Sequence, residues 1–72
     1  MSGNADLAKR AREQASQAES GSLDRRAYGC AAVALATTRS LTAARQALAG
    51  VHPPELATMA RKYLDELARD AV

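Results

Sequence analysis

The chain of 72 residues contains no tryptophan, phenylalanine or isoleucine, and its only aromatic side chains are two tyrosines. Because β-strands are enriched in aromatic and β-branched residues, this composition argues against a sheet. Alanine, the strongest helix former, supplies about a quarter of the residues. The sequence therefore predicts an all-α fold, and its length corresponds to a single domain near the lower limit for a self-sufficient core.

Cysteine and histidine each occur once, as Cys30 and His52. A single cysteine cannot form an internal disulfide, which fits a reducing compartment. One histidine without a thiol or carboxylate at ligand spacing cannot build a zinc site, and no pair of titratable residues is arranged as a general acid and base. We therefore expect no metal, no cofactor and no enzymatic activity. Cys30 is expected to be a buried structural residue, and His52 a solvated loop residue or a partner contact.

Long hydrophobic runs are also missing. The longest stretch without a charge covers residues 27–38, whereas a membrane-spanning helix needs about 20 apolar residues. The stretch is too apolar all round for a surface helix, so we expect a central helix that its neighbours bury. The N-terminus, MSGNADLAKRAREQ, lacks the apolar core of a signal peptide. A cytoplasmic protein without membrane contact is expected.

Capping residues and helix breakers predict four helices, at about residues 5–20, 22–38, 40–50 and 54–71. Asn4 and Ser22 are expected N-caps, Gly50 the glycine that ends the third helix, and Pro54 the first residue of the fourth. The first helix has one leucine on its apolar face, so residues 1–21 are expected to be the least anchored, either packed or mobile. We predict one compact domain, a bundle of three to four short helices, with the second helix at its centre.

The fourth predicted helix has the most regular pattern. Its apolar residues share one broad face, formed by Leu56, Ala57, Ala60, Tyr63, Leu64, Leu67 and Ala71. On the opposite face Arg61 stands four residues before Asp65, and Lys62 four residues before Glu66. This is the spacing of ion pairs within a helix, so both pairs are expected.

The second predicted helix carries a strip of small residues, Gly29, Ala32 and Ala36. A glycine in a helix interior costs about 1 kcal/mol relative to alanine, and close approach of a neighbouring helix would compensate for this cost. Large apolar side chains are few, and small domains with thin cores often rely on oligomerisation. We therefore predict a homodimer that pairs through the second helix or through the alanine face of the first.

Residues 28–51 resemble a tetratricopeptide hairpin. Tyr28 and Ala32 take the places of the aromatic and small residues of that motif, and Leu35 follows. The second helix of the hairpin would carry Leu41, Ala44 and Leu48. The resemblance implies two packed antiparallel helices. It identifies no family, because no second copy follows at the period of about 34 residues that defines such repeats.

Positive charge is concentrated in the first part of the chain. The net charge is +2, and residues 1–50 carry seven Lys or Arg against four Asp or Glu, whereas residues 51–72 carry three against four. Clustered basic residues contact phosphates, and the candidates here are Lys9, Arg10, Arg12, Arg25 and Arg26. Acidic residues are interleaved with them, and there is no aromatic platform for stacking bases. A small nucleic-acid-binding regulator is therefore the alternative prediction.

The leading prediction is a non-enzymatic protein–protein interaction module, such as an adaptor, a regulator or an accessory subunit, that self-associates. The expected partner surface is centred on Met59 and includes Tyr63 and the loop with His52 and Pro54. An exposed apolar patch with a polar rim marks a docking site, and the flexible thioether of methionine adapts to such a surface. The alternative is that Met59 only covers the edge of the core.

Overall fold

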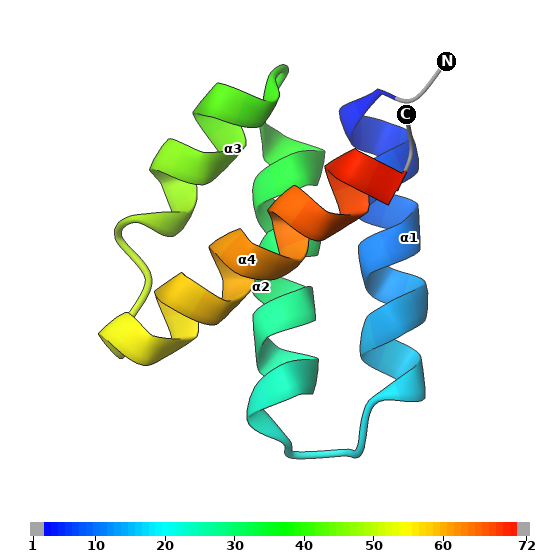
Figure 1. Ribbon diagram of the computed structural model, residues 1–72, viewed down its shortest axis with the longest axis vertical. Coiled ribbons are helices and arrows are strands. Elements are labelled where there is room, and N and C mark those ends of the chain that lie inside the picture. The colour runs from blue at the N-terminus through cyan, green and yellow to red at the C-terminus, as the bar shows by residue number, and fades with distance from the viewer. Residues whose placement is uncertain (1–2, 71–72) are drawn as a thin grey trace.

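Four helices account for most of the chain in the computed structural model, which describes residues 3–70 (Figure 1). They are α1 (Asn4–Gln17), α2 (Leu23–Thr37), α3 (Leu41–Leu48) and α4 (Pro54–Asp70). The all-α fold is confirmed, since 79% of the described residues are helical and these residues contain no strand.

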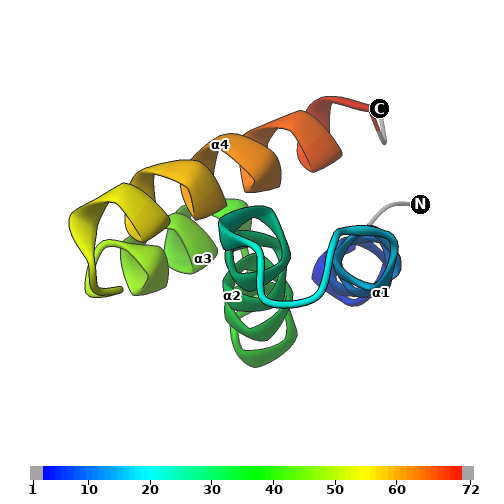
Figure 2. The same cartoon turned by 90° about the horizontal axis from the view of Figure 1, so that it is seen from below.

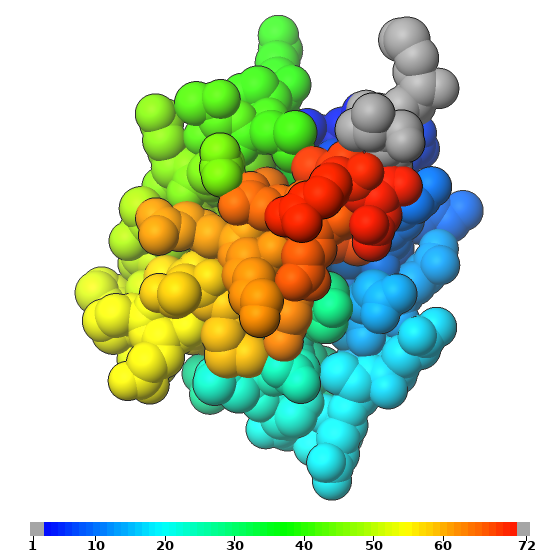
Figure 3. Space-filling model, viewed as in Figure 1, coloured from blue at the N-terminus to red at the C-terminus, as the bar shows by residue number. Residues whose placement is uncertain are grey.

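The second helix occupies the centre of the bundle. α1 and α2 are antiparallel neighbours, α3 returns beside α2, and α4 crosses one face of these three helices (Figures 1 and 2). α2 contacts all three other helices, as the sequence predicts. In the space-filling view, α4 covers the middle of the face turned toward the viewer (Figure 3).

The core combines a few leucines with many alanines. Its buried residues are Leu7, Ala8, Ala11, Ala27, Ala31, Ala32, Ala34, Leu35, Ala44, Leu48, Leu56, Ala57, Ala60, Leu64 and Leu67. The largest fully buried side chains are Leu35, Leu48 and Leu64, one from each of α2, α3 and α4. The predicted apolar face of α4 is therefore confirmed for its leucines and for Ala57 and Ala60. Ala71 lies outside the described residues.

Two serines begin helices as N-caps. Ser22 Oγ accepts a hydrogen bond from the Arg25 N–H at 3.1 Å, and Ser40 Oγ accepts one from the Ala43 N–H at 3.0 Å. Each bond satisfies an N–H group that has no partner within the helix. The predicted cap at Ser22 and the predicted start of α4 at Pro54 are both confirmed.

The predicted N-cap at Asn4 is wrong. Asn4 is the first residue of α1, and the N-cap is Gly3. The Asn4 side-chain NH₂ group instead lies 3.0 Å from the Thr38 carbonyl oxygen, 3.2 Å from Thr38 Oγ1 and 3.1 Å from the Ser40 carbonyl oxygen. It donates across the fold and ties the start of α1 to the connection between α2 and α3.

Gly21 and Gly50 both lie close to helix ends but differ in backbone conformation. Gly21 lies in the turn between α1 and α2 with a φ of 80°, a conformation that glycine adopts without steric cost. Gly50 directly follows Ala49, the C-cap of α3, so its predicted place at the end of this helix is confirmed, but it lacks the positive φ that is common for glycine there. The chain leaves α3 through a tight turn in which the Val51 N–H donates to the Leu48 carbonyl at 3.1 Å.

One side of α2 faces solvent, in contrast to the predicted burial all round. Val33 is 64% exposed, Ala36 is exposed, and Gly29 and Cys30 are only partly buried. A Cβ atom built on Gly29 would meet no atom within 4 Å. The predicted close approach of another helix at Gly29 is therefore not found within the chain, and Cys30 is not a fully buried residue. Within residues 3–70, no helix has the length and hydrophobicity that crossing a bilayer requires.

Replacement of Leu64 tests the core. Leu64 is fully buried, so Leu64→Ala should lower the free energy of unfolding by about 2–5 kcal/mol. Arg61→Ala, on the exposed side of the same helix, should change it by less than about 0.5 kcal/mol. Thermal and urea unfolding followed by circular dichroism would measure both, and equal melting of the two variants would contradict the observed facing of α4.

Replacement of Gly29 tests the open side of α2. Since a Cβ has free space there, Gly29→Ala should raise the free energy of unfolding by about 0.5–1 kcal/mol through helix propensity. Thermal and urea unfolding of this variant would be measured at low protein concentration, so that association between chains does not affect the stability. Destabilisation by Gly29→Ala would show that another helix packs closely against this position.

Candidate interaction surface

An apolar groove runs along the exposed side of α2. One wall is formed by Arg26, Gly29, Cys30, Val33, Ala34 and Thr37 of α2, and the other by Ala47, Leu48, Val51, His52 and Leu56. The second wall comes from the end of α3, the following loop and the first turn of α4. No carboxylate lines the groove, and its ionisable residues are Arg26, Cys30 and His52.

The spacing of residues in α2 places this groove on one side of the helix. Arg26, Cys30, Val33 and Thr37 follow one another at intervals of four, three and four residues, which keeps them on one stripe of a helix. Ala27 and Ala31 are buried in the core and do not line the groove, whereas the buried Ala34 lies at the edge of this stripe. Isolated exposed apolar residues need no explanation, but contiguous ones form a candidate docking surface.

Tyr63 makes its main contacts within the chain. Its ring stacks on Tyr28 with a centroid separation of 4.2 Å and an interplanar angle of 8°. Its hydroxyl donates a hydrogen bond to Asp24 Oδ1 at 2.6 Å. Aromatic pairs of this kind contribute about 0.5–1.5 kcal/mol beyond the area that they bury. The cluster therefore anchors α4 to the first two turns of α2.

The same cluster shifts the ionisation of both tyrosines. The hydrogen bond to Asp24, partial burial and the nearby negative charges raise the pKa of Tyr63 to about 12. Burial, followed by the charges of Glu66 and Asp24, raises the pKa of Tyr28. Both shifts favour the neutral phenol in the folded state, so they are a property of the packing between α2 and α4.

The residues of the predicted partner surface lie in different surroundings. Met59 is partly buried and packs against the core, and Tyr63 lies in the tyrosine cluster. His52 and Pro54 are exposed, and His52 lines the groove. The groove residues of α2 are absent from the sequence-based prediction. The sequence does place Cys30 and Val33 on one side of the helix. Because apolar residues occur on all sides of this stretch, the pattern does not show that this side is the exposed one.

The predicted basic residues are all exposed but belong to separate parts of the surface. Lys9 and Arg10 line a hollow between α1 and α4 that also contains Asp6, Glu13 and Asp70. Arg12 is exposed on α1, whereas Arg25 and Arg26 are exposed in the first turn of α2, beside the end of α1 (Figure 1). Acidic side chains thus interrupt the positive charge on α1.

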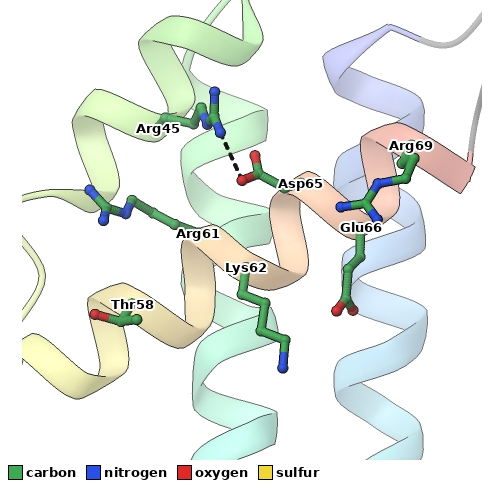
Figure 4. Close-up of a pocket in the computed structure, with 7 residues that line it drawn as sticks. All are labelled: Arg45, Thr58, Arg61, Lys62, Asp65, Glu66 and Arg69. Carbon is green, nitrogen blue, oxygen red and sulfur yellow. Dashed lines mark hydrogen bonds and ion pairs between the residues drawn. The ribbon is translucent and has the colours of Figure 1, made fainter.

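A second polar hollow lies over α3 and α4 (Figure 4). Asp65 accepts a hydrogen bond from Arg45 of α3 at 2.8 Å in an exposed ion pair, so the predicted pairing of Asp65 with Arg61 is wrong. Lys62 and Glu66 form no ion pair within the described part of the chain. Exposed pairs contribute only about 0–1 kcal/mol to stability.

Comparisons with protein-family models, with curated proteins and with solved structures found no match. Residues 3–70 contain no group of three or more His, Cys, Asp or Glu side chains that could hold a metal ion. The groove, the tyrosine cluster and the distribution of charge are the features of this chain that bear on its function.

Ionisation of Tyr63 tests the tyrosine cluster. Its folded-state pKa of about 12 lies above the ordinary value of about 10. The cluster should stabilise the fold fully below pH 10 and lose this contribution as the pH rises from about 10 through 12. Spectrophotometric titration should detect the late ionisation, and Tyr63→Phe should remove it and lower stability at neutral pH by about 0.5–1.5 kcal/mol. A tyrosine pair that titrates near pH 10 would contradict the hydrogen bond to Asp24.

Proposed function

We propose that this chain is a non-enzymatic protein–protein interaction module, acting as an adaptor, regulator or accessory subunit, and that it self-associates through the exposed side of α2. The observation that supports the proposal is the apolar groove, in which Val33 keeps 64% of its surface exposed. Removing apolar surface from water favours association, although the affinity also depends on shape and on the entropy lost on binding. The free thiol of Cys30 fits a reducing compartment such as the cytoplasm.

The choice of α2 follows from the packing of α1. The alanine face of α1 contributes Ala8 and Ala11 to the core, where α2 covers it within the same chain. This face is therefore not available to a second chain, and of the two helices predicted to pair, α2 remains. Ala32 of its predicted small-residue strip is buried, so the proposal uses the groove side of α2 instead. The tyrosines with shifted pKa values hold helices together, so the proposal includes no catalytic step.

Nucleic acid is the second candidate partner because Arg25 and Arg26 are both exposed in the first turn of α2. Phosphates favour basic side chains and helix N-termini. Asp24 in the same turn and the mixed charges on α1 weigh against a strong phosphate surface. We therefore rank protein partners first.

Sedimentation equilibrium tests the proposed self-association. The weight-average mass should rise above 7.6 kDa as the protein concentration increases through the micromolar range. A mass of 7.6 kDa at every concentration would contradict self-association.

Binding to random duplex DNA, measured over a series of salt concentrations, tests the alternative. Affinity that falls steeply with salt would favour a phosphate-binding function, whereas weak binding without this slope would favour the protein module.

A further inference from the structure

The polar hollow over α3 and α4, called the α3–α4 hollow below, carries an excess of positive charge. Its cationic lining residues are Arg45, Arg61, Lys62 and Arg69, and its carboxylates are Asp65 and Glu66. Four positive charges against two negative charges leave this hollow with a net charge of +2. The hollow between α1 and α4, by contrast, contains two cationic side chains and three carboxylates. The positive balance therefore distinguishes the α3–α4 hollow from the polar hollow beside α1.

Helix spacing brings these charges together. On α4, Arg61, Asp65 and Arg69 follow one another at intervals of four residues, so they lie on one side of the helix. Arg61 and Arg69 are about 12 Å apart along the helix axis at 1.5 Å per residue. Arg45 reaches the same side from α3, and in Figure 4 the four cationic side chains lie around Asp65. Two helices thus contribute to one charged surface.

Most of this positive charge is available to a partner. The Arg45–Asp65 pair, at 2.8 Å, is the only ion pair in the described part of the chain, and it neutralises one of the two carboxylates. Arg61, Lys62 and Arg69 are all exposed and form no ion pair with the residues that the structure describes. Each guanidinium carries five N–H donors and each ammonium three. Three cationic groups therefore face solvent with donors that the acceptors of a partner can use.

The two carboxylates decide which kind of anion the hollow fits. Guanidinium groups bind both carboxylates and phosphates. A nucleic acid presents a continuous row of phosphates, which Asp65 and Glu66 would repel, and no aromatic side chain lines the hollow to stack a base. An extended peptide places alternate side chains on one side and offers backbone N–H groups, from which Asp65 and Glu66 can accept hydrogen bonds. The mixed lining therefore favours an acidic peptide over a nucleic acid.

We propose that the α3–α4 hollow binds an acidic, extended peptide segment of a partner protein, whose carboxylates meet Arg61, Lys62 and Arg69. An extended chain rises about 3.3 Å per residue, so acidic side chains four residues apart match the separation of Arg61 and Arg69. The site rests on the proposed role as an interaction module and names the chemistry of the partner. It shares no lining residue with the groove on α2, so it does not require self-association.

Fluorescence anisotropy with a defined acidic peptide tests the site. The probe is a labelled, end-blocked peptide in which glutamate and serine alternate, and the control probe has glutamine in place of every glutamate. The acidic peptide should bind, and its affinity should fall as the salt concentration rises, because salt screens exposed charges. The glutamine peptide should not bind. Absence of binding by the acidic peptide at low salt, or equal binding of the two peptides, would overturn the proposal.

Two matched double variants locate the bound peptide. Arg61→Gln combined with Lys62→Gln should raise the Kd of the acidic peptide about fivefold, since two exposed contacts to carboxylates are lost. Lys9→Gln combined with Arg12→Gln removes the same charges from exposed positions on α1 and should change the Kd by less than about twofold, because charges outside the site are largely screened. Circular dichroism should show that both variants stay folded, since all four side chains are exposed. Equal losses of affinity in the two variants would overturn the site.

Replacement of Asp65 tests the charge argument in the opposite direction. Asp65→Asn removes a carboxylate from the hollow and releases Arg45 from its ion pair. The Kd of the acidic peptide should therefore fall by about twofold to fivefold. An unchanged or higher Kd would overturn the assignment of carboxylate binding to this hollow.

Further measurements separate this site from a phosphate site and from self-association. Random duplex DNA that binds more tightly than the acidic peptide, and that loses affinity when Arg61 and Lys62 are replaced, would overturn the choice of a peptide. A wild type that stays a monomer in sedimentation equilibrium but binds the acidic peptide through Arg61 and Lys62 would contradict self-association alone. A chain that self-associates and does not bind the acidic peptide would contradict this site alone.

Discussion

Close packing of alanines around α2 is the constraint on which the rest of the fold depends. Ala27, Ala31 and Ala34 are buried in the centre of the bundle, and side chains this small let neighbouring helices approach closely. The space between the helices is then filled by a small number of leucines, of which Leu35, Leu48 and Leu64 are almost completely buried. Each leucine consequently carries a large share of the hydrophobic stabilisation, because alanine buries little area.

Specific polar contacts complement this packing by fixing how the helices are placed around α2. Asn4 ties the start of α1 to the α2–α3 connection, and Tyr63 binds Asp24 to hold α4 over the start of α2. These contacts join residues that are more than 30 positions apart in the sequence. Hydrogen bonds have directional requirements that alanine contacts lack, so they discriminate between arrangements that would bury similar apolar area.

The helices were predictable from the sequence because their signals are local. Ser22 caps the helix that follows it, Pro54 begins the next one, and the face with Leu56 and Leu64 repeats at helical spacing. Asn4 and Asp65 could not be assigned in this way. A rule that considers neighbouring residues predicts a cap at Asn4 and a pair of Asp65 with Arg61. Asn4 instead bonds to the connection between α2 and α3, and Asp65 to a residue of α3. The candidate site was missed for the same reason, since the apolar run around Val33 does not reveal which side the neighbours leave uncovered.

α2 has an uncovered side because the described part of the chain provides three other helices to pack around it. α1, α3 and α4 cover part of the circumference of α2, and no further helix follows among the described residues to cover the rest. The tyrosine cluster and the groove lie on different sides of α2, since Tyr28 and Asp24 contact α4 whereas Cys30 and Val33 line the groove. Contacts that hold the monomer together are thus separated from those available to a partner. Residues of the groove can therefore be changed without touching the contacts of Tyr63 with Tyr28 and Asp24 that hold α4 against α2.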